Sequence, residues 1–185
     1  MGQRPLRIVL AVLTVVAGAA CGTGPPSATA RSAASSYDEY AVASCAAWDA
    51  LFRAVGNPDT ASGSDLSRRL DQAVASGDAG SAERVAAEIV KELRVGREQV
   101  AIAGGWQPRA AVMVQLDRVL AAYQAMITAK LALARHEANA VDPQSAFEQA
   151  GGVEAYFAWI EALRATGAGA DGASAKQCPN VPVTP

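Results

Sequence analysis

The chain has 185 residues, of which 51% are apolar, and a formal net charge of −2. This length leaves room for one ordinary domain with a leader and a tail. Because the basic residues are few and scattered, the sequence offers no phosphate-binding stripe, and nucleic acid is not an expected partner. The 43 alanines, with only ten aromatic residues and no alternating β-branched stretches after residue 35, predict an all-α domain.

The first 20 residues have the three parts of a secretory signal peptide: a basic start with two arginines, an apolar run over residues 8–16, and small residues before Cys21. The alternative is a permanent membrane helix. The apolar stretch from residue 6 to 20 would span only about 22 Å as a helix, whereas a bilayer core is roughly 30 Å thick. We therefore expect export and removal of residues 1–20.

The residues VAGAAC, which end at Cys21, resemble the lipobox of bacterial lipoproteins, with Gly18 where that motif usually has Leu. The resemblance implies that Cys21 is acylated and anchors the chain to the cell membrane, facing outside the cytoplasm. The alternative is ordinary signal-peptidase cleavage after Ala19 or Ala30, which would discard Cys21. Residues 21–36 are rich in Gly, Pro, Ser and Ala, and we expect them to form a flexible tether.

Two helices are expected in the first part of the domain. One spans residues 37–55 and stops at residues 56–59, and a short one spans residues 65–76 before the break at 77–80. The sequence leaves open whether the short helix forms a hairpin with the next one. The apolar faces predicted by helical spacing are Ala41, Cys45, Trp48, Phe52 and Val55 in the first helix, and Leu66, Leu70 and Val74 in the second.

Two longer helices are expected over residues 81–103 and 108–139, joined at Gly104-Gly105 and a turn with Pro108 at its start. The first carries a seam with 4-3 spacing over three heptads, and the second carries a wide apolar face. These faces consist of Ala82, Ala86, Ile89, Leu93, Gly96, Val100 and Ala103, and of Val112, Leu116, Val119, Leu120, Tyr123, Ile127, Leu131 and Ala134.

The last helix is expected to start at Asp142-Pro143, to be broken or kinked at Gly151-Gly152, and to end near residue 165. Its predicted face consists of Phe147, Val153, Phe157, Ile160 and either Arg164 or Leu163. Four main helices plus one short helix, with short connections, predict an up-and-down bundle over residues 37–166. Residues 167–185 then form a Gly/Ala/Pro tail.

The cysteines predict how this tail is held. Once Cys21 is acylated, an exported chain retains Cys45 and Cys178, an even pair for an oxidising compartment. In an alternating bundle the last helix ends near the start of the first, and the eleven residues 167–177 can extend about 37 Å. We therefore expect a Cys45–Cys178 disulfide, which the chain-entropy model values at about 4.7 kcal/mol. The alternative is two unpaired thiols, with Cys45 buried in the helical seam.

No pattern of residues indicates catalysis, a cofactor or a metal site. His136 is the one histidine, lacks the Glu-x-x-His partner of helical di-metal sites, and is expected to lie on a solvated helix end. Glu88 and Glu92 share a helix face, but Arg84 and Lys91 lie near them, so ion-paired surface is expected. Residues 167–172 match G-x-G-x-x-G without the strand and helix that a dinucleotide site needs, so they are interpreted as linker.

Two functional hypotheses remain. The first is a membrane-tethered, non-enzymatic cell-envelope protein that acts through contacts with an unknown envelope macromolecule. The second is an extracytoplasmic binding protein that holds a small apolar or amphipathic ligand between helices, with Trp48, Tyr156, Phe157 and Trp159 as the aromatic residues most able to line its pocket. Alanine-rich seams bring helices close together and leave little interior volume, which favours the first hypothesis.

Overall fold

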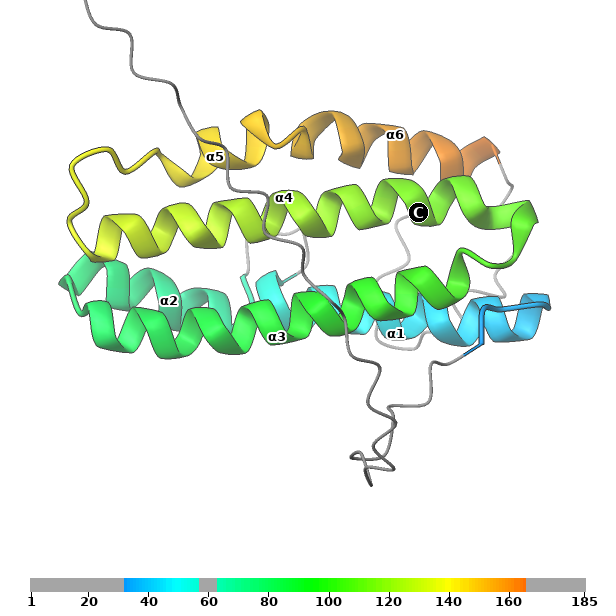
Figure 1. Cartoon of the computed structure of the whole chain (residues 1–185), viewed down its shortest axis with the longest axis horizontal. Coiled ribbons are helices and arrows are strands. Elements are labelled where there is room, and N and C mark those ends of the chain that lie inside the picture. The colour runs from blue at the N-terminus through cyan, green and yellow to red at the C-terminus, as the bar shows by residue number, and fades with distance from the viewer. Residues whose placement is uncertain (1–31, 57–62, 166–185) are drawn as a thin grey trace, which may run out of the picture. The chain divides into compact units, whose positions relative to one another are not determined.

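A computed structural model describes residues 32–56 and 63–165, and the regular elements in these ranges are helices (Figure 1). The expected all-α bundle is confirmed. Within the described residues no helix is both long enough and apolar enough to cross a bilayer. In chain order the elements are α1 (Tyr37–Val55), α2 (Asp65–Ser76), α3 (Ala79–Ala103), the 3-10 turn η1 (Gln107–Arg109), α4 (Ala110–Ala134), α5 (Pro143–Gln149) and α6 (Gly152–Ala165).

Side-chain caps define where four of these helices begin. In each case an oxygen of the capping residue accepts a hydrogen bond from the backbone N–H three residues later. α3 starts two residues before the predicted position because its cap is Asp78, whose carboxylate accepts from the Ser81 N–H at 2.9 Å. The other caps are Ser36 on Glu39, Ser64 on Ser67 and Asp142 on Ser145, at 3.3, 2.9 and 2.8 Å.

The long helix is shorter than predicted at both ends. Residues 107–109 form the 3-10 turn η1, so α4 starts at Ala110 rather than Pro108. It ends at Ala134 rather than Asn139, because His136 adopts a left-handed conformation with φ +54°. The His136 N–H bonds to the Leu133 carbonyl, and the next N–H bonds to the Ala132 carbonyl, each at 3.0 Å. This is a Schellman motif with His in the position usually held by Gly.

The break predicted at Gly151-Gly152 is confirmed, and it separates α5 from α6. Gly151 has φ +74°, which turns the chain between the two helices. Gly152 lies under the ring of Phe147, where an added Cβ would be 2.5 Å from the ring carbons. The pair therefore provides both the turn and the close approach that the break requires.

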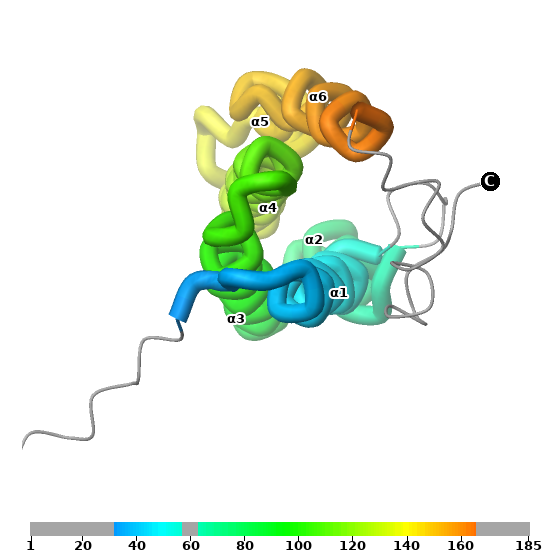
Figure 2. Tube along the Cα trace, turned by 90° about the vertical axis from the view of Figure 1, so that its right-hand side faces the viewer, coloured from blue at the N-terminus to red at the C-terminus, as the bar shows by residue number. Residues whose placement is uncertain are grey.

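The main helices alternate in direction. α2 and α3 form a hairpin through Gly77-Asp78, and α3 and α4 form a second hairpin through η1 (Figure 1). Viewed end on, α1, α3, α4 and α6 follow one another in an arc, with α5 beside α4 (Figure 2). As expected, α6 ends at the end of the bundle where α1 begins. The core lies among α1, α2, α3 and α4, and its fully buried large side chains include Leu51, Leu70, Ile89, Leu93, Leu116 and Leu120.

α1 uses a different face for its closest packing than the spacing predicted. Of the predicted face only Ala41 is buried, and Cys45, Trp48, Phe52 and Val55 are half-buried. Apart from Tyr40 and Leu51, the other buried residues of α1 form a stripe of alanines, which lack side chains beyond Cβ and let α1 approach α3 closely. On α3 they meet Gly96, where an added Cβ would lie 3.5 Å from both Ala47 O and Ala50 Cβ. The stripe consists of Ala43, Ala47, Ala50 and Ala54.

Packing begins before α1, so the predicted tether over residues 21–36 is too long at its C-terminal end. Ala34 is buried, and its N–H donates to the Ile102 carbonyl at 2.8 Å. The segment crosses directly over Gly105, where an added Cβ would be 2.5 Å from Ala33 Cβ. Composition alone suggested a flexible segment, but a small residue can pack closely where its neighbour is glycine.

Candidate functional site

Some of the candidate residues named from the sequence lie in the described ranges, and others do not. Cys21, Cys178 and the glycine-rich residues 167–172 lie outside them, so lipidation, the disulfide and the linker interpretation stay predictions. Cys45 lies on α1 and is half-buried rather than buried in the seam. It shares one side of that helix with Trp48 and Phe52, three and seven positions further on.

His136 is exposed, as expected of a solvated helix end. Its imidazole lies over the turn between α2 and α3, where an added Cβ on Gly77 would be 3.3 Å from Nε2. Both residues have positive φ, and both follow the last turn of a helix. The role visible for His136 is therefore to end α4 and to contact the end of α2. In residues 32–56 and 63–165, no three His, Cys, Asp or Glu side chains are grouped closely enough to hold a metal ion.

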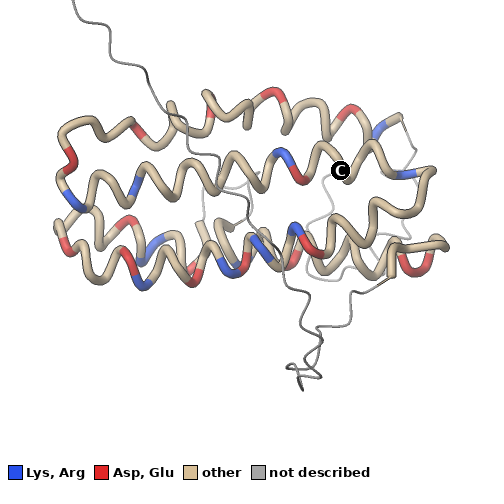
Figure 3. The backbone as a smooth tube through the Cα atoms, in the orientation of Figure 1, with Lys and Arg blue, Asp and Glu red and all other residues tan. Residues whose placement is uncertain are grey.

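Glu88 and Glu92 are ion-paired, but with other partners than the sequence indicated. Glu88 pairs with Arg69 of α2 at 3.5 Å, and Glu92 pairs with Arg53 of α1 at 2.9 Å. Each acid thus joins α3 to a neighbouring helix. Further pairs between helices join Arg135 to Glu83 at 2.7 Å and Lys130 to Asp71. Basic and acidic residues are intermixed along α3, whereas the charged residues of α5 and α6 are acidic except for Arg164 (Figure 3).

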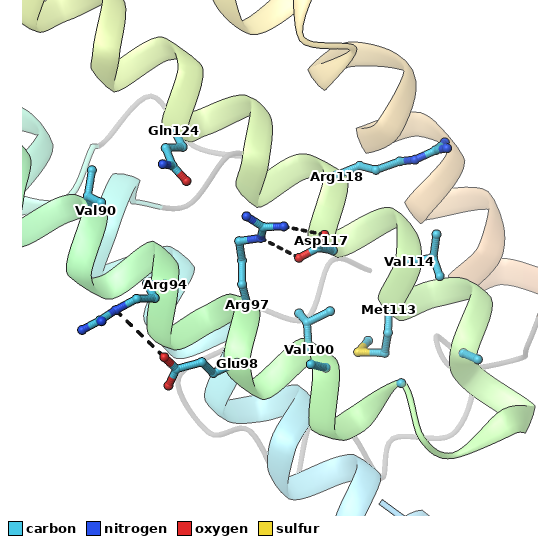
Figure 4. A pocket seen from close by; sticks show the side chains of 13 residues that line it. Val90, Arg94, Arg97, Glu98, Val100, Met113, Val114, Asp117, Arg118 and Gln124 are labelled. Carbon is cyan, nitrogen blue, oxygen red and sulfur yellow. Dashed lines mark hydrogen bonds and ion pairs between the residues drawn. The ribbon is translucent and has the colours of Figure 1, made fainter. Parts of the chain in front are cut away.

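A groove with a volume of about 940 Å³ runs between α3 and α4 (Figure 4). It is open to solvent rather than enclosed. Its apolar surface comes from both helices and includes Val114, which is 54% exposed. The other apolar side chains that line it are Val90, Val100, Ala101, Ala110 and Met113, of which Val100 and Met113 are buried.

The charges in this groove are largely paired with one another. Arg97 of α3 and Asp117 of α4 form a bidentate pair, with Nε–Oδ1 and NH2–Oδ2 distances of 2.7 and 3.0 Å (Figure 4). Hydrogen bonding to Asp117 raises the pKa of the Arg97 guanidinium above its ordinary value. Arg94 lies 3.9 Å from Glu98 one turn further along α3. A partner of the groove therefore meets an apolar strip crossed by a neutralised ion pair.

The groove was not found from the sequence, although a signal for it exists. In a hairpin of two helices, residues at equal distances from the turn lie side by side. Arg97 and Asp117 are each ten positions from residue 107, and Val100 and Met113 are seven and six positions from it. Counting outward from the predicted turn would have paired these residues.

A second apolar surface lies between α1 and α6, and we call it the aromatic face: Trp48 and Phe52 of α1 with Tyr156 and Trp159 of α6. The Trp48 and Trp159 ring centroids are 4.6 Å apart, and each ring also contacts the second aromatic residue of its own helix, at 5.3 and 5.9 Å. Three of the four residues predicted to line a pocket thus come together here. Phe157 does not join them in the interior, because it is 61% exposed.

The aromatic face contains an unsatisfied polar group. Trp159 is 7% exposed, and its indole Nε1–H is buried without an acceptor among the described residues. Trp side chains usually find a hydrogen-bond partner when they are buried. A buried N–H that lacks one carries a free-energy penalty of about 1–3 kcal/mol, which an acceptor placed on this face would remove.

Aromatic residues also gather at the end of the bundle where the N-terminal segment enters. Trp106 contacts Tyr37 and Tyr40, with ring centroids 5.3 and 5.2 Å away. Burial raises the pKa of Tyr40 above its ordinary value of 10.0, against the opposing effects of the Ser44 hydroxyl and the nearby Arg109 charge. Arg109 is itself only 7% exposed. The bundle is therefore closely packed at the end that the predicted membrane tether joins.

Comparisons with protein-family models, with curated proteins and with solved structures found no match to this chain. The candidate binding surfaces in the described part of the chain are the groove between α3 and α4 and the aromatic face between α1 and α6.

Proposed function

We propose that this chain is an exported lipoprotein, anchored through acylated Cys21, that acts without catalysis by binding an amphipathic helix of another cell-envelope protein. The observation that carries the binding role is the open groove between α3 and α4, where Val114 is 54% exposed. Grooves of this kind bind helices that present apolar residues on one side. The Arg97–Asp117 pair neutralises the charges at its centre, which favours an apolar partner over an ionic one.

The anchor restricts where this groove can act. Cys21 and Ala34 are 13 positions apart, so the chain between them can extend at most about 45 Å. Ala34 packs against the C-terminal end of α3, so this end of the bundle is the one that the tether joins. A partner within this reach of the membrane surface fits the proposal.

Mass spectrometry of the membrane fraction tests the anchor. The expected N-terminus is a diacylated or triacylated Cys21. An N-terminus at Ala20 or Arg31 in the soluble fraction would disprove the anchor. It would leave the groove untouched, since the groove belongs to the folded domain.

Site-specific photo-crosslinking in intact cells tests the contact, with a crosslinking residue in place of Val114. Val42 of α1 is a matched control, because it is another valine on a helix and is 71% exposed. The expected result is one discrete adduct at position 114 and none at position 42. The crosslinked partner segment should be an amphipathic helix, and a synthetic peptide of that segment should bind the purified protein.

Val114→Asp should abolish that peptide binding, while Val42→Asp should preserve it.

The groove's volume of about 940 Å³ also lies within the 300–1,000 Å³ range of small-ligand pockets. Native mass spectrometry of protein purified from its own cells therefore serves as the opposing test. A small apolar molecule that co-purifies and is lost in Val114→Asp would overturn the macromolecular contact in favour of ligand binding.

A further inference from the structure

We infer that the chain's own C-terminal segment, residues 178–185 with the sequence CPNVPVTP, docks on the aromatic face. In this arrangement Cys178 is bonded to Cys45, and a backbone carbonyl of the segment accepts from Trp159 Nε1. The inference adds an intramolecular ligand to the proposed function. It depends on that proposal only for export to a compartment where disulfides form.

The C-terminal segment follows α6 closely enough in the chain to reach the aromatic face. α6 ends at Ala165, at the end of the bundle where α1 begins. Cys45 lies eight residues into α1, about 12 Å along the helix. Cys178 follows Ala165 by 13 residues, which can extend about 45 Å. The segment can therefore reach Cys45 and continue over Trp48.

The composition of residues 178–185 fits a surface lined with aromatic rings. Residues 178–185 contain three prolines and two valines and no charge, whereas residues 166–177 are mainly Gly, Ala and polar. Proline-rich segments adopt the extended polyproline II conformation and bind surfaces lined with aromatic rings. The aromatic face supplies four such rings, and Cys45 lies beside them on the same side of α1.

The aromatic face also contains a hydrogen-bond donor that the segment can satisfy. Trp159 Nε1–H is buried and finds no acceptor in the described part of the chain. A segment in polyproline II conformation has backbone carbonyls free to accept, because this conformation makes no internal hydrogen bonds. One carbonyl over Trp159 would satisfy the donor.

The covalent step balances as an ordinary thiol–disulfide exchange. A thiolate of one cysteine attacks the disulfide of a thiol oxidoreductase in the export compartment and forms a mixed disulfide. The thiolate of the second cysteine then attacks the first cysteine's sulfur in that mixed disulfide and displaces the oxidoreductase thiolate. The Cys45–Cys178 S–S bond forms, two S–H bonds are lost, and the two electrons and two protons reduce the donor disulfide to a dithiol.

The test of docking is NMR on the full mature chain. The methyl groups of Val181 and Val183 should be shifted upfield by the ring currents of Trp48 and Trp159, and they should show NOEs to those indoles. Random-coil methyl shifts for both valines in the oxidised protein would overturn the docking. Sedimentation of the oxidised protein as a dimer that Val181→Asp leaves intact would also overturn it, because a second copy rather than the C-terminal segment would then cover the aromatic face.

The role of the indole N–H is tested where docking is reversible, in a Cys45→Ser chain. Trp159→Phe keeps an aromatic ring and removes the donor, so the docking constant should fall about tenfold, as expected for one hydrogen bond. Trp106→Phe is the matched control, because the ring contacts of Trp106 among the described residues are with Tyr37 and Tyr40 rather than with the aromatic face, and it should leave the constant unchanged. Equal effects of the two substitutions would refute the assigned hydrogen bond.

The disulfide is tested separately by alkylating the protein before reduction and digesting it. A peptide pair linked through Cys45 and Cys178 is expected. Alkylated Cys45 and Cys178 would overturn the bridge.

Charged substitutions in the segment provide a second test of docking. Val181→Asp with Val183→Asp should prevent docking and return the segment to random-coil shifts, whereas Ala173→Asp with Ala175→Asp, which adds the same charge between α6 and the segment, should leave the methyl shifts in place. None of these results depends on acylation of Cys21, so failure of the anchor and failure of docking can be told apart.

Discussion

The indole rings of Trp48 and Trp159 meet with their centroids 4.6 Å apart, which joins the first and last helices of the described bundle. α6 packs mainly on α4, and α1 packs mainly on α3. The Trp48–Trp159 contact is therefore where the two ends of the arc of helices touch. Trp159 of α6 is also part of the main hydrophobic core.

We expect Trp48→Ala to lower the free energy of unfolding by about 2 kcal/mol, because it removes a half-buried ring and its contacts with Phe52 and Trp159. Urea unfolding followed by circular dichroism measures the change. Phe157→Ala is the control, since that ring is 61% exposed, and it should change stability by less than about 0.5 kcal/mol. Equal costs would mean that the Trp48–Trp159 contact does not stabilise the bundle.

Gly105→Ala should displace the segment that precedes α1. The new methyl group would lie 2.5 Å from Ala33 Cβ and 2.9 Å from the backbone N and O of Ala34. We expect a loss of about 1–2 kcal/mol from overpacking. Hydrogen exchange at the Ala34 amide, which bonds to the Ile102 carbonyl, should also become faster.

Gly80→Ala is the matched control for this substitution, because Gly80 lies in the first turn of α3 and an added Cβ would be 3.7 Å from its nearest neighbour, Asp78 Oδ1. Helix propensity should make that change neutral or stabilising by up to about 1 kcal/mol. If Gly105→Ala also proved neutral, the close packing of residues 33–34 would be wrong.

His136→Gly should stabilise the protein by about 1 kcal/mol, because glycine adopts the left-handed conformation at φ +54° without a Cβ penalty. His136→Ala keeps that penalty and removes only an exposed imidazole, so a change below about 0.5 kcal/mol is expected. Gly77→Ala should act in the opposite direction, since Gly77 has φ +67°. Thermal unfolding of the three variants checks the order, and a loss above about 2 kcal/mol in His136→Ala would indicate a buried, partnered histidine.

The caps of α1 and α3 predict weaker folding in acid. Hydrogen bonds from Ser81 hold the pKa of Asp78 below its ordinary value of 3.8. The Ser81 side chain has the largest effect, and its backbone N–H has the next largest. The backbone N–H of Ser35 is the main group that lowers the pKa of Glu39 below 4.5. A carboxylate with a lowered folded-state pKa stabilises the fold above its unfolded-state pKa, and this contribution is lost as the pH falls through the folded-state value.

The difference in Tm between the parent chain and Asp78→Ala should therefore be largest near neutral pH and should shrink below about pH 4. Thermal unfolding followed at several pH values measures it. Gln72→Ala, at an exposed position inside α2, should show a difference that does not vary with pH. A constant difference for Asp78→Ala would show that its carboxylate charge does not contribute to the cap.

Local features made most of the helices predictable. α1 and α2 have the predicted bounds, because serine caps and glycine stops act within a few residues of chain. The seam of α3 was also correctly predicted, and all seven of its residues are buried. The end of α4 was not, because His136 lacks the glycine signal of a left-handed C-cap and adopts that conformation all the same.

The candidate surfaces were predictable only as residue types. Trp48, Tyr156 and Trp159 were recognised as able to line a site, but not which helices would bring them together. The ion pairs show the same limit, because Glu88 and Glu92 found partners on α2 and α1 rather than on their own helix. Charged side chains pair with whatever lies nearest in space, and nearness between helices depends on packing.

The sequence by itself determined the all-α class, most of the helix bounds and the break at Gly151-Gly152, because propensity, capping and glycine turns are local properties of the chain. Tertiary structure alone decided which of two apolar stripes of α1 meets α3. Either stripe has the helical spacing of a core face, but only the alanines permit the close approach at Gly96. The larger side chains, Trp48 and Phe52, were thereby left toward α6, where they form the aromatic face.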